Sequence, residues 1–147
     1  MDVTALARSL LEPIPAHRTA GLEVLRIAEV SLLTPPELTN VIGSLHSSGL
    51  ITLADAAGLV AIIAAVEAED EMRGVLPLGA AATLEFRAPA RGLLTASCRL
   101  GAAERQALRP VLSGRQKRAR IVTVADITDE AHALVCRGTF EWSVRRP

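Results

Sequence analysis

The sequence predicts a single α+β domain in which an antiparallel sheet wraps around one long apolar helix. Residues 41–66 form an apolar stretch that contains one formally charged residue, Asp55. The second half of the chain alternates apolar and polar residues with a period of two, which is typical of antiparallel strands with one covered face. The length of 147 residues fits one domain spanning 1–147, because a chain of this size can bury a core without metals or disulfides.

Residues 1–20 are expected to form an N-terminal helix and a lead-in to the domain. Apolar residues within 2–11 recur at helical spacing, and Pro13 and Pro15 are expected to end this helix. Residues 22–33 are then predicted to form one strand, which ends at the turn Thr34-Pro35-Pro36.

The long helix is expected to begin near Ser47 or Ser48, since serine is a good N-cap residue. It should run to about Val66, where an acidic cluster of Glu67, Glu69, Asp70 and Glu71 follows. Acidic residues oppose the helix macrodipole at a C-terminus, so either the helix frays there or the cluster lies outside it. The helix is apolar nearly all round and one sheet covers only one side. A second copy of the chain is therefore expected to bury the rest, as a homodimer or a dimer of dimers.

Residues 49–66 approach the length of a membrane span. Asp55 lies near the middle of this segment, however, and its ends lack aromatic or basic anchors. We therefore expect a helix buried in a soluble protein, with no membrane partner.

Four strands are predicted after the long helix. They cover residues 82–88, 93–100, 118–126 and 132–142, and a short polar connection is expected between the second and third. With the strand before the helix, they complete the predicted sheet.

Composition excludes several classes of protein. A formal net charge of zero argues against a nucleic-acid binder, and an aromatic content of 2% argues against a base-stacking platform. Cys98 and Cys136 lie on apolar strand faces and are expected to be buried, packed thiols. His17 and His132 lack metal-like partners, so no metal is expected. The first residues show no signal-peptide pattern, so a cytoplasmic location is expected.

Asp55 is the first candidate for chemistry. Burying a lone carboxylate is costly unless the group is paired or protonated. One interpretation is structural: the carboxylate caps a neighbouring loop or contacts a partner subunit. The other is functional: it acts as a general base or a nucleophile.

The second candidate is the predicted start of the long helix, at His46, Ser47 and Ser48. Free N–H groups at the positive end of the helix dipole can stabilise an oxyanion, although simple capping by serine is the alternative. His46 and Asp55 are nine residues apart, which is half a turn out of phase at 100° per residue. A site that uses both residues therefore needs two subunits.

The residues Asn40, Gly43, His46 and Asp55 resemble the helix-entry motif of the phenylacetate-type hotdog thioesterases, the PaaI-like family. That motif runs N-x-x-G-T-x-H-G-G, with an acidic residue nine positions after the histidine. Residues 86–92 and 128–142 also resemble the strand and turn that follow and the closing strands of the family, so the similarity spans roughly residues 20–143.

The resemblance implies a hotdog dimer, often paired into tetramers, that hydrolyses acyl-CoA thioesters. Asp55 is then the base or nucleophile, and the Ser47 N–H is the oxyanion donor. Asn40 and His46 are supporting groups, contributed by the other subunit. No separate cofactor is implied, because coenzyme A is part of the substrate.

Two positions depart from the family pattern. Ser47-Ser48 replaces Gly-Gly, which places Ser48 beside the expected substrate. A hydroxyl-bearing residue found early in the next strand of some members aligns near Gly79, so Thr83 would have to take its place.

Basic residues could meet the phosphates of coenzyme A. Arg91, Arg115 and Lys117 are the expected contacts, because they flank a turn and the start of a strand. Arg118 and Arg120 belong to the same cluster as Arg115 and Lys117. Arg87 is the remaining basic candidate, and most basic residues on strand ends and turns are simply solvated.

Two other functions are compatible with a hotdog fold. A non-catalytic module would bind an acyl group or only assemble with itself. Hotdog hydratases that act on enoyl-CoA have a motif in which an Asp is followed five residues later by a His. In this sequence the fifth residue after Asp55 is Val60. The thioesterase therefore remains the leading hypothesis.

Overall fold

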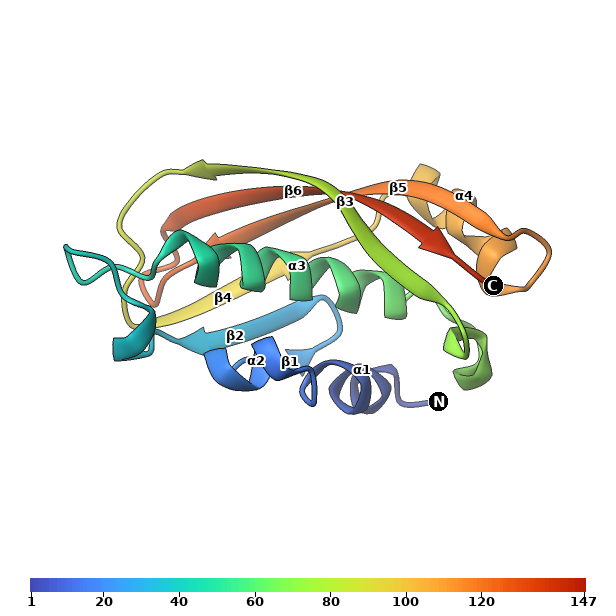
Figure 1. Ribbon diagram of the computed structural model, residues 1–147, viewed down its shortest axis with the longest axis horizontal. Coiled ribbons are helices and arrows are strands. Elements are labelled where there is room, and N and C mark those ends of the chain that lie inside the picture. Colours follow the sequence, from blue (N-terminus) through green and yellow to red (C-terminus); the bar gives the residue numbers. More distant parts are fainter.

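The computed structural model describes all 147 residues. One six-stranded sheet curves around a central helix (Figure 1), and its strand order is β1-β2-β4-β5-β6-β3. The helices are α1 (Val3–Leu11), α2 (Pro15–Ala20), α3 (Ser47–Ile63) and α4 (Ala102–Leu112), with 3-10 turns η1 (Pro36–Leu38) and η2 (Glu69–Met72). The strands are β1 (Glu23–Arg26), β2 (Glu29–Leu33), β3 (Leu76–Phe86), β4 (Leu93–Cys98), β5 (Arg118–Thr128) and β6 (Leu134–Arg145). All neighbouring strands are antiparallel, which confirms the predicted sheet around one long helix.

Small residues on α3 let the sheet approach closely. A Cβ atom at Gly58 would lie 2.8 Å from both Thr123 Oγ1 and Trp142 Cζ2. Trp142 is 2% exposed and stacks on Phe140 with 5.3 Å between ring centroids. Its Nε1 donates a hydrogen bond to Thr123 Oγ1 at 2.8 Å. The inner face of β5 and β6 is thus held against α3 at a glycine.

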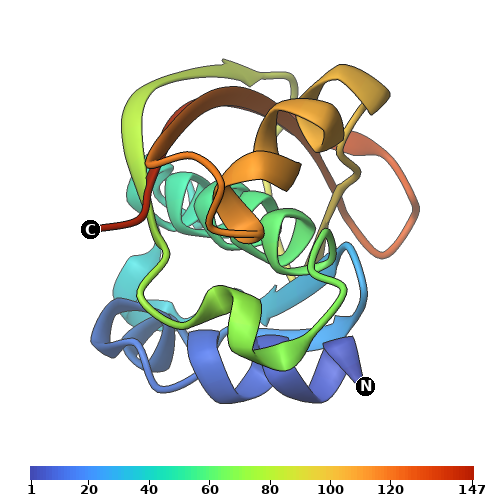
Figure 2. The ribbon, with the colours of Figure 1, turned by 90° about the vertical axis from the view of Figure 1, so that its right-hand side faces the viewer.

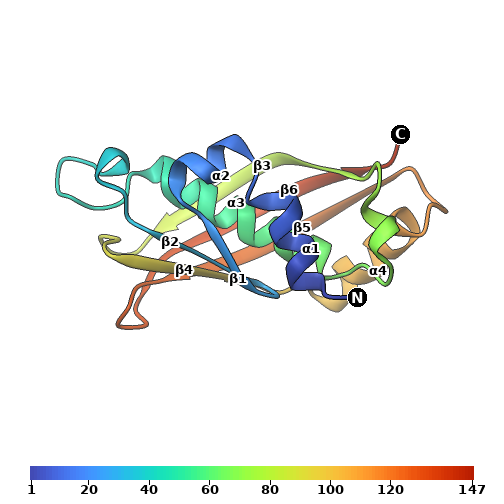
Figure 3. The ribbon, with the colours of Figure 1, turned by 90° about the horizontal axis from the view of Figure 1, so that it is seen from below.

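The N-terminal helices cover a side of α3 that the sheet leaves open. Both α1 and α2 contact α3, and the view in Figure 3 shows them lying across it. Eleven of the 17 residues of α3 are buried within one chain. The apolar composition of α3 therefore does not by itself require a second copy, which corrects one premise of the sequence argument.

The region before α3 contains two departures from the predicted elements. Residues 22–33 form not one strand but the hairpin β1–β2, which reverses at Ile27–Ala28. The turn has no glycine or proline, and Ala28 itself adopts a positive φ of 69°. Pro15 begins α2 instead of ending helical structure, because the first helical position needs no N–H donor.

The region after α3 contains two further departures from the predicted elements. The predicted polar connection contains the helix α4, which closes one end of the barrel-like sheet (Figure 2). Its apolar side buries Leu108, Val111 and Leu112. β3 also begins at Leu76, well before residue 82, because an edge strand tolerates Pro77.

The ends of α3 also differ in detail from the prediction. Its N-cap residue is His46 rather than a serine, and the helix ends at Ile63. The acidic cluster therefore lies outside the helix, in and around η2. α3 has 17 residues, and neither it nor any other helix combines the length and the apolar character that a membrane span needs.

Both cysteines are free and buried, as predicted. Burial raises the pKa of the Cys98 thiol to about 11. Burial also raises the pKa of the Cys136 thiol. Neither thiol is a thiolate nucleophile at neutral pH, so both serve in packing.

Candidate functional site

The start of α3 leaves one backbone donor without a partner. His46 has extended backbone angles (φ −61°, ψ 150°) and caps the helix. Its Nδ1 accepts the Ser48 N–H at 3.1 Å, and its carbonyl accepts the N–H groups of Gly49 and Leu50. No group of the chain accepts the Ser47 N–H. This donor therefore remains available at the positive end of the helix dipole.

The loop before α3 is organised by Asn40. Its Oδ1 accepts the backbone N–H groups of Ile42 at 3.0 Å and Ser44 at 3.1 Å, and Gly43 supplies the left-handed conformation that the loop requires (φ 70°). The Ser44 hydroxyl in turn accepts the Ala90 N–H at 2.8 Å. Because Oδ1 is used within the loop, the Asn40 Nδ2 group is the end of the amide that is free to donate to a ligand.

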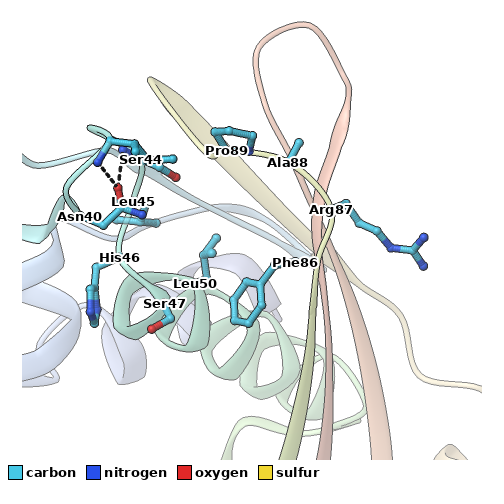
Figure 4. Close-up of a pocket in the computed structure, with 11 residues that line it drawn as sticks. Asn40, Ser44, Leu45, His46, Ser47, Leu50, Phe86, Arg87, Ala88 and Pro89 are labelled. Atoms are coloured by element: carbon cyan, nitrogen blue, oxygen red, sulfur yellow. Dashed lines mark hydrogen bonds between the residues drawn. The ribbon is translucent and has the colours of Figure 1, made fainter.

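A cleft of about 570 Å³ opens between this loop, the start of α3 and the end of β3 (Figure 4). One end is polar, with Asn40, His46 and Ser47, while Leu50 and Phe86 form an apolar wall. The lining residues are Asn40, Ile42, Ser44, Leu45, His46, Ser47, Leu50, Phe86, Arg87, Ala88 and Pro89. The arrangement therefore combines hydrogen-bond donors with an apolar surface, as ligand pockets commonly do.

Asp55 does not line this cleft. It lies two turns further along α3, and its side chain is 33% exposed. With Ile51 and Leu59 it forms a stripe of residues four apart on one side of the helix, and all three are at least partly exposed. The structure thus separates His46 from Asp55 within one chain, as the helical phase predicts.

Asp55 has a partner that the sequence did not indicate. His17, on α2, is 3% exposed, and its Nε2 lies 3.7 Å from Asp55 Oδ2. The other ring nitrogen, Nδ1, lies 2.8 Å from the carbonyl oxygen of Leu11. Because His17 and Asp55 are 38 positions apart in sequence, no local motif could have connected them.

Gly79 and Thr83 lie on the exposed edge strand β3, outside the cleft. Thr83 precedes Leu84, which packs against the core, so Thr83 is on the opposite, outer face of the strand. The hydroxyl of Thr83 is therefore directed away from α3 in its own chain. Within one chain, neither Gly79 nor Thr83 reaches the cleft.

The predicted phosphate contacts are divided between two ends of the molecule. Arg91 donates a hydrogen bond to the Ile42 carbonyl at 2.8 Å, beside the cleft. Arg115 lines a separate cavity with Arg105 and Arg109, and Lys117 donates to the Pro147 carbonyl at 3.0 Å. Within one chain, only Arg91 of the three predicted residues is near the cleft.

The apolar wall of the cleft was also absent from the sequence prediction. Phe86 is 60% exposed and points toward Leu50 and Ser47, whereas Arg87 points away (Figure 4). Phe86 lies two residues after Leu84, which packs against the core, so both side chains are on the inner face of β3. A large apolar side chain that is exposed at the end of this face lacks a packing partner within its own chain. The exposure of Phe86 therefore indicates a surface that a ligand can cover.

Comparison with known families identifies the domain. A family model described as Domain of unknown function (DUF4442) matches residues 12–144. No curated protein matches the sequence.

Solved structures share the fold over nearly the whole chain. A protein of unknown function from Pseudomonas aeruginosa, described as a probable thioesterase, has a TM-score of 0.77 and 26% identity, over 97% of this chain and 95% of that chain. The PaaI protein of the phenylacetic acid degradation operon of Escherichia coli has a TM-score of 0.68 and 17% identity, over 99% and 94%. A thioesterase from Haemophilus influenzae has a TM-score of 0.64 and 18% identity, over 92% and 86%.

These similarities confirm the resemblance to PaaI-like proteins that the helix-entry motif indicated. The family model covers far more than half of the chain, and the sheet wrapped around α3 is the architecture that the solved structures share. The chain therefore belongs to the DUF4442 family, on the hotdog fold of the thioesterase superfamily.

Proposed function

We propose that this protein is a thioesterase that hydrolyses acyl-CoA thioesters at a site built from two copies of the chain. The observation that carries the proposal is the unpaired Ser47 N–H at the start of α3, in a cleft that also contains Asn40 and an apolar wall. A thioester presents a carbonyl oxygen that becomes an oxyanion during hydrolysis, and preorganised N–H donors stabilise that charge.

The carboxylate required for water activation comes from Asp55 of the second copy. Asp55 lies on the open stripe of α3, away from the cleft of its own chain. A two-fold axis beside this stripe gives each cleft the Asp55 of the other subunit, because both subunits then use the same surface.

The edge strand β3 supports a contact with a second copy. β3 ends the sheet and leaves one edge without a strand partner. Leu76, Leu78 and Phe86 of this strand are about half exposed or more. A long, apolar, unpaired edge is a template for pairing with another strand. We infer a homodimer, which two-fold pairing could extend to a dimer of dimers.

In the proposed reaction, Asp55 of one subunit acts first, and the donors in the cleft of the other subunit act next. The Asp55 carboxylate removes a proton from water as the water oxygen forms a bond to the thioester carbonyl carbon. The Ser47 N–H and the Asn40 Nδ2 donate to the resulting oxyanion. The carbon–sulfur bond then breaks, and the departing thiolate receives the proton that Asp55 holds. His46 orients the cleft by capping α3 through Nδ1.

The coenzyme A moiety would lie along the basic side of the cleft. Arg91 flanks the loop at Ile42, and a guanidinium group can bind phosphate with two parallel hydrogen bonds. The acyl chain would then contact Leu50 and Phe86. No cofactor other than the substrate's own coenzyme A is needed for this reaction.

The purified protein is expected to hydrolyse at least one member of a panel of acyl-CoA esters of increasing chain length. Release of free coenzyme A can be followed with a thiol reagent, with the Asp55→Asn variant as the matched control. If no ester is hydrolysed faster with the wild type than in the same buffer without protein, the protein is not an acyl-CoA thioesterase. Binding of acyl-CoA without hydrolysis in the same assay would identify a non-catalytic acyl-binding module.

A further inference from the structure

His17 occupies a place in the fold that a packing role alone does not explain. The helix α2 is only six residues long. Pro15 begins it, and Gly21 ends it with a φ of 66°. These two residues confine α2 to a short turn that holds the His17 ring beside α3. The ring is nearly fully buried, so the role of each polar nitrogen depends on the group that it faces.

The two ring nitrogens have different partners. Nδ1 faces the carbonyl oxygen of Leu11 at 2.8 Å. A carbonyl can only accept, so Nδ1 carries a proton and donates it. In the neutral ring, Nε2 is therefore the nitrogen with the lone pair. Nε2 is also the nitrogen that faces Asp55 Oδ2, at 3.7 Å.

The distance of 3.7 Å is longer than a hydrogen bond but lies within reach of a small side-chain rotation. As a carboxylate, Asp55 has no proton to give to Nε2. Once it has taken a proton from water, its O–H can donate to the Nε2 lone pair. The contact therefore tightens at the step in which Asp55 acts as a base.

We propose that His17 is a positioning residue that orients the Asp55 carboxyl group and accepts a hydrogen bond from its protonated form. This inference rests on the proposed function of Asp55 as the base. Contact with Oδ2 leaves Oδ1 for the water molecule on the open side of α3. His17 acts through Asp55 and does not touch the substrate.

Two substitutions separate this role from a structural one. His17→Asn keeps an N–H donor where Nδ1 stands, so it retains the bond to Leu11 but removes the group that faces Asp55. His17→Gln places an amide where Nε2 stands, so it retains the contact with Asp55 but loses the bond to Leu11. The two variants thus exchange the two partners of the ring.

We expect His17→Asn to lower kcat by about 10- to 100-fold while KM changes by less than about twofold, since a misplaced catalytic group costs rate rather than binding. His17→Gln should recover most of kcat, despite a melting temperature a few degrees lower. A wild-type kcat in His17→Asn, or a kcat in His17→Gln no higher than in His17→Asn, would overturn the proposal and leave His17 with a structural role.

A second measurement does not depend on activity. In ¹⁵N spectra of the histidine rings, His17 should show a protonated Nδ1 and a bare Nε2. Asp55→Asn should shift the Nε2 resonance of His17 while the resonances of His132, which is exposed on the β5–β6 turn, stay in place. An unchanged His17 Nε2 resonance would contradict the contact itself. Absence of thioesterase activity in the wild type, with this shift present, would instead count against the proposed function alone.

Discussion

Asp55→Asn is expected to lower kcat for acyl-CoA hydrolysis by about 10²- to 10⁴-fold, the usual cost of losing a positioned acid or base. The amide is nearly isosteric with the carboxylate but cannot remove a proton from water. Asp55 is one-third exposed and its nearest polar partner is His17, so the substitution should leave the fold intact. Steady-state kinetics, with a circular dichroism melt of the same sample, measure both effects.

Asp70→Asn is the matched control for this variant. The substitution makes the same chemical change, but in the exposed 3-10 turn η2, where Asp70 has no ion-pair partner. It should retain wild-type turnover. Equal turnover in Asp55→Asn and Asp70→Asn would assign Asp55 a structural role and remove the base from the proposed reaction.

Trp142→Ala is expected to produce the largest loss of stability, about 3–5 kcal/mol. The indole is 2% exposed, stacks on Phe140 and packs over Gly58 of α3. Removing it leaves a cavity between α3 and the sheet and deprives Thr123 Oγ1 of its indole N–H donor. Denaturant unfolding should show the midpoint shifted to lower concentration with an unchanged slope.

Trp142→Phe is the matched control for the packing effect, because it keeps most of the apolar volume but removes the N–H donor. Its loss should be clearly smaller than that of Trp142→Ala. Both measurements need the same protomer concentration, since an oligomer's apparent stability depends on it. Equal midpoints for wild type and Trp142→Ala would mean that the contact of β6 with α3 does not hold the core together.

The sequence predicted those parts of the fold whose pattern is local and periodic. α3 was recognisable because one apolar run continues for several turns, and β4, β5 and β6 because their residues alternate. The missed elements carry contradictory signals. α4 contains Pro110 and three charged residues among eleven, and its apolar side is recognisable only from its packing against β5. The β1–β2 hairpin turns at Ala28 without a glycine or proline, so residues 22–33 resemble one strand.

The candidate site, like the fold, was predictable only where its residues are close together in the sequence. Asn40, His46 and Ser47 are close in sequence, so one loop and one helix start bring them together in the cleft. Helical phase alone was sufficient to separate Asp55 from them. The contact between His17 and Asp55 depends on how α2 packs against α3, and the exposure of Phe86 depends on where β3 ends. Neither is encoded in a local pattern, so only the folded chain reveals them.

The central claim, a site shared between two chains, is tested most directly by mixing the Asp55→Asn and Asn40→Ala variants under conditions that let subunits exchange. Each variant alone should be inactive. A heterodimer contains one site with both substitutions and one site with neither, so full statistical exchange should restore about a quarter of the wild-type sites. Mass spectrometry of the intact dimers verifies the exchange. A stable monomer, or verified heterodimers that remain as inactive as the two parent variants, would contradict the shared site and require Asp55 to act within its own chain.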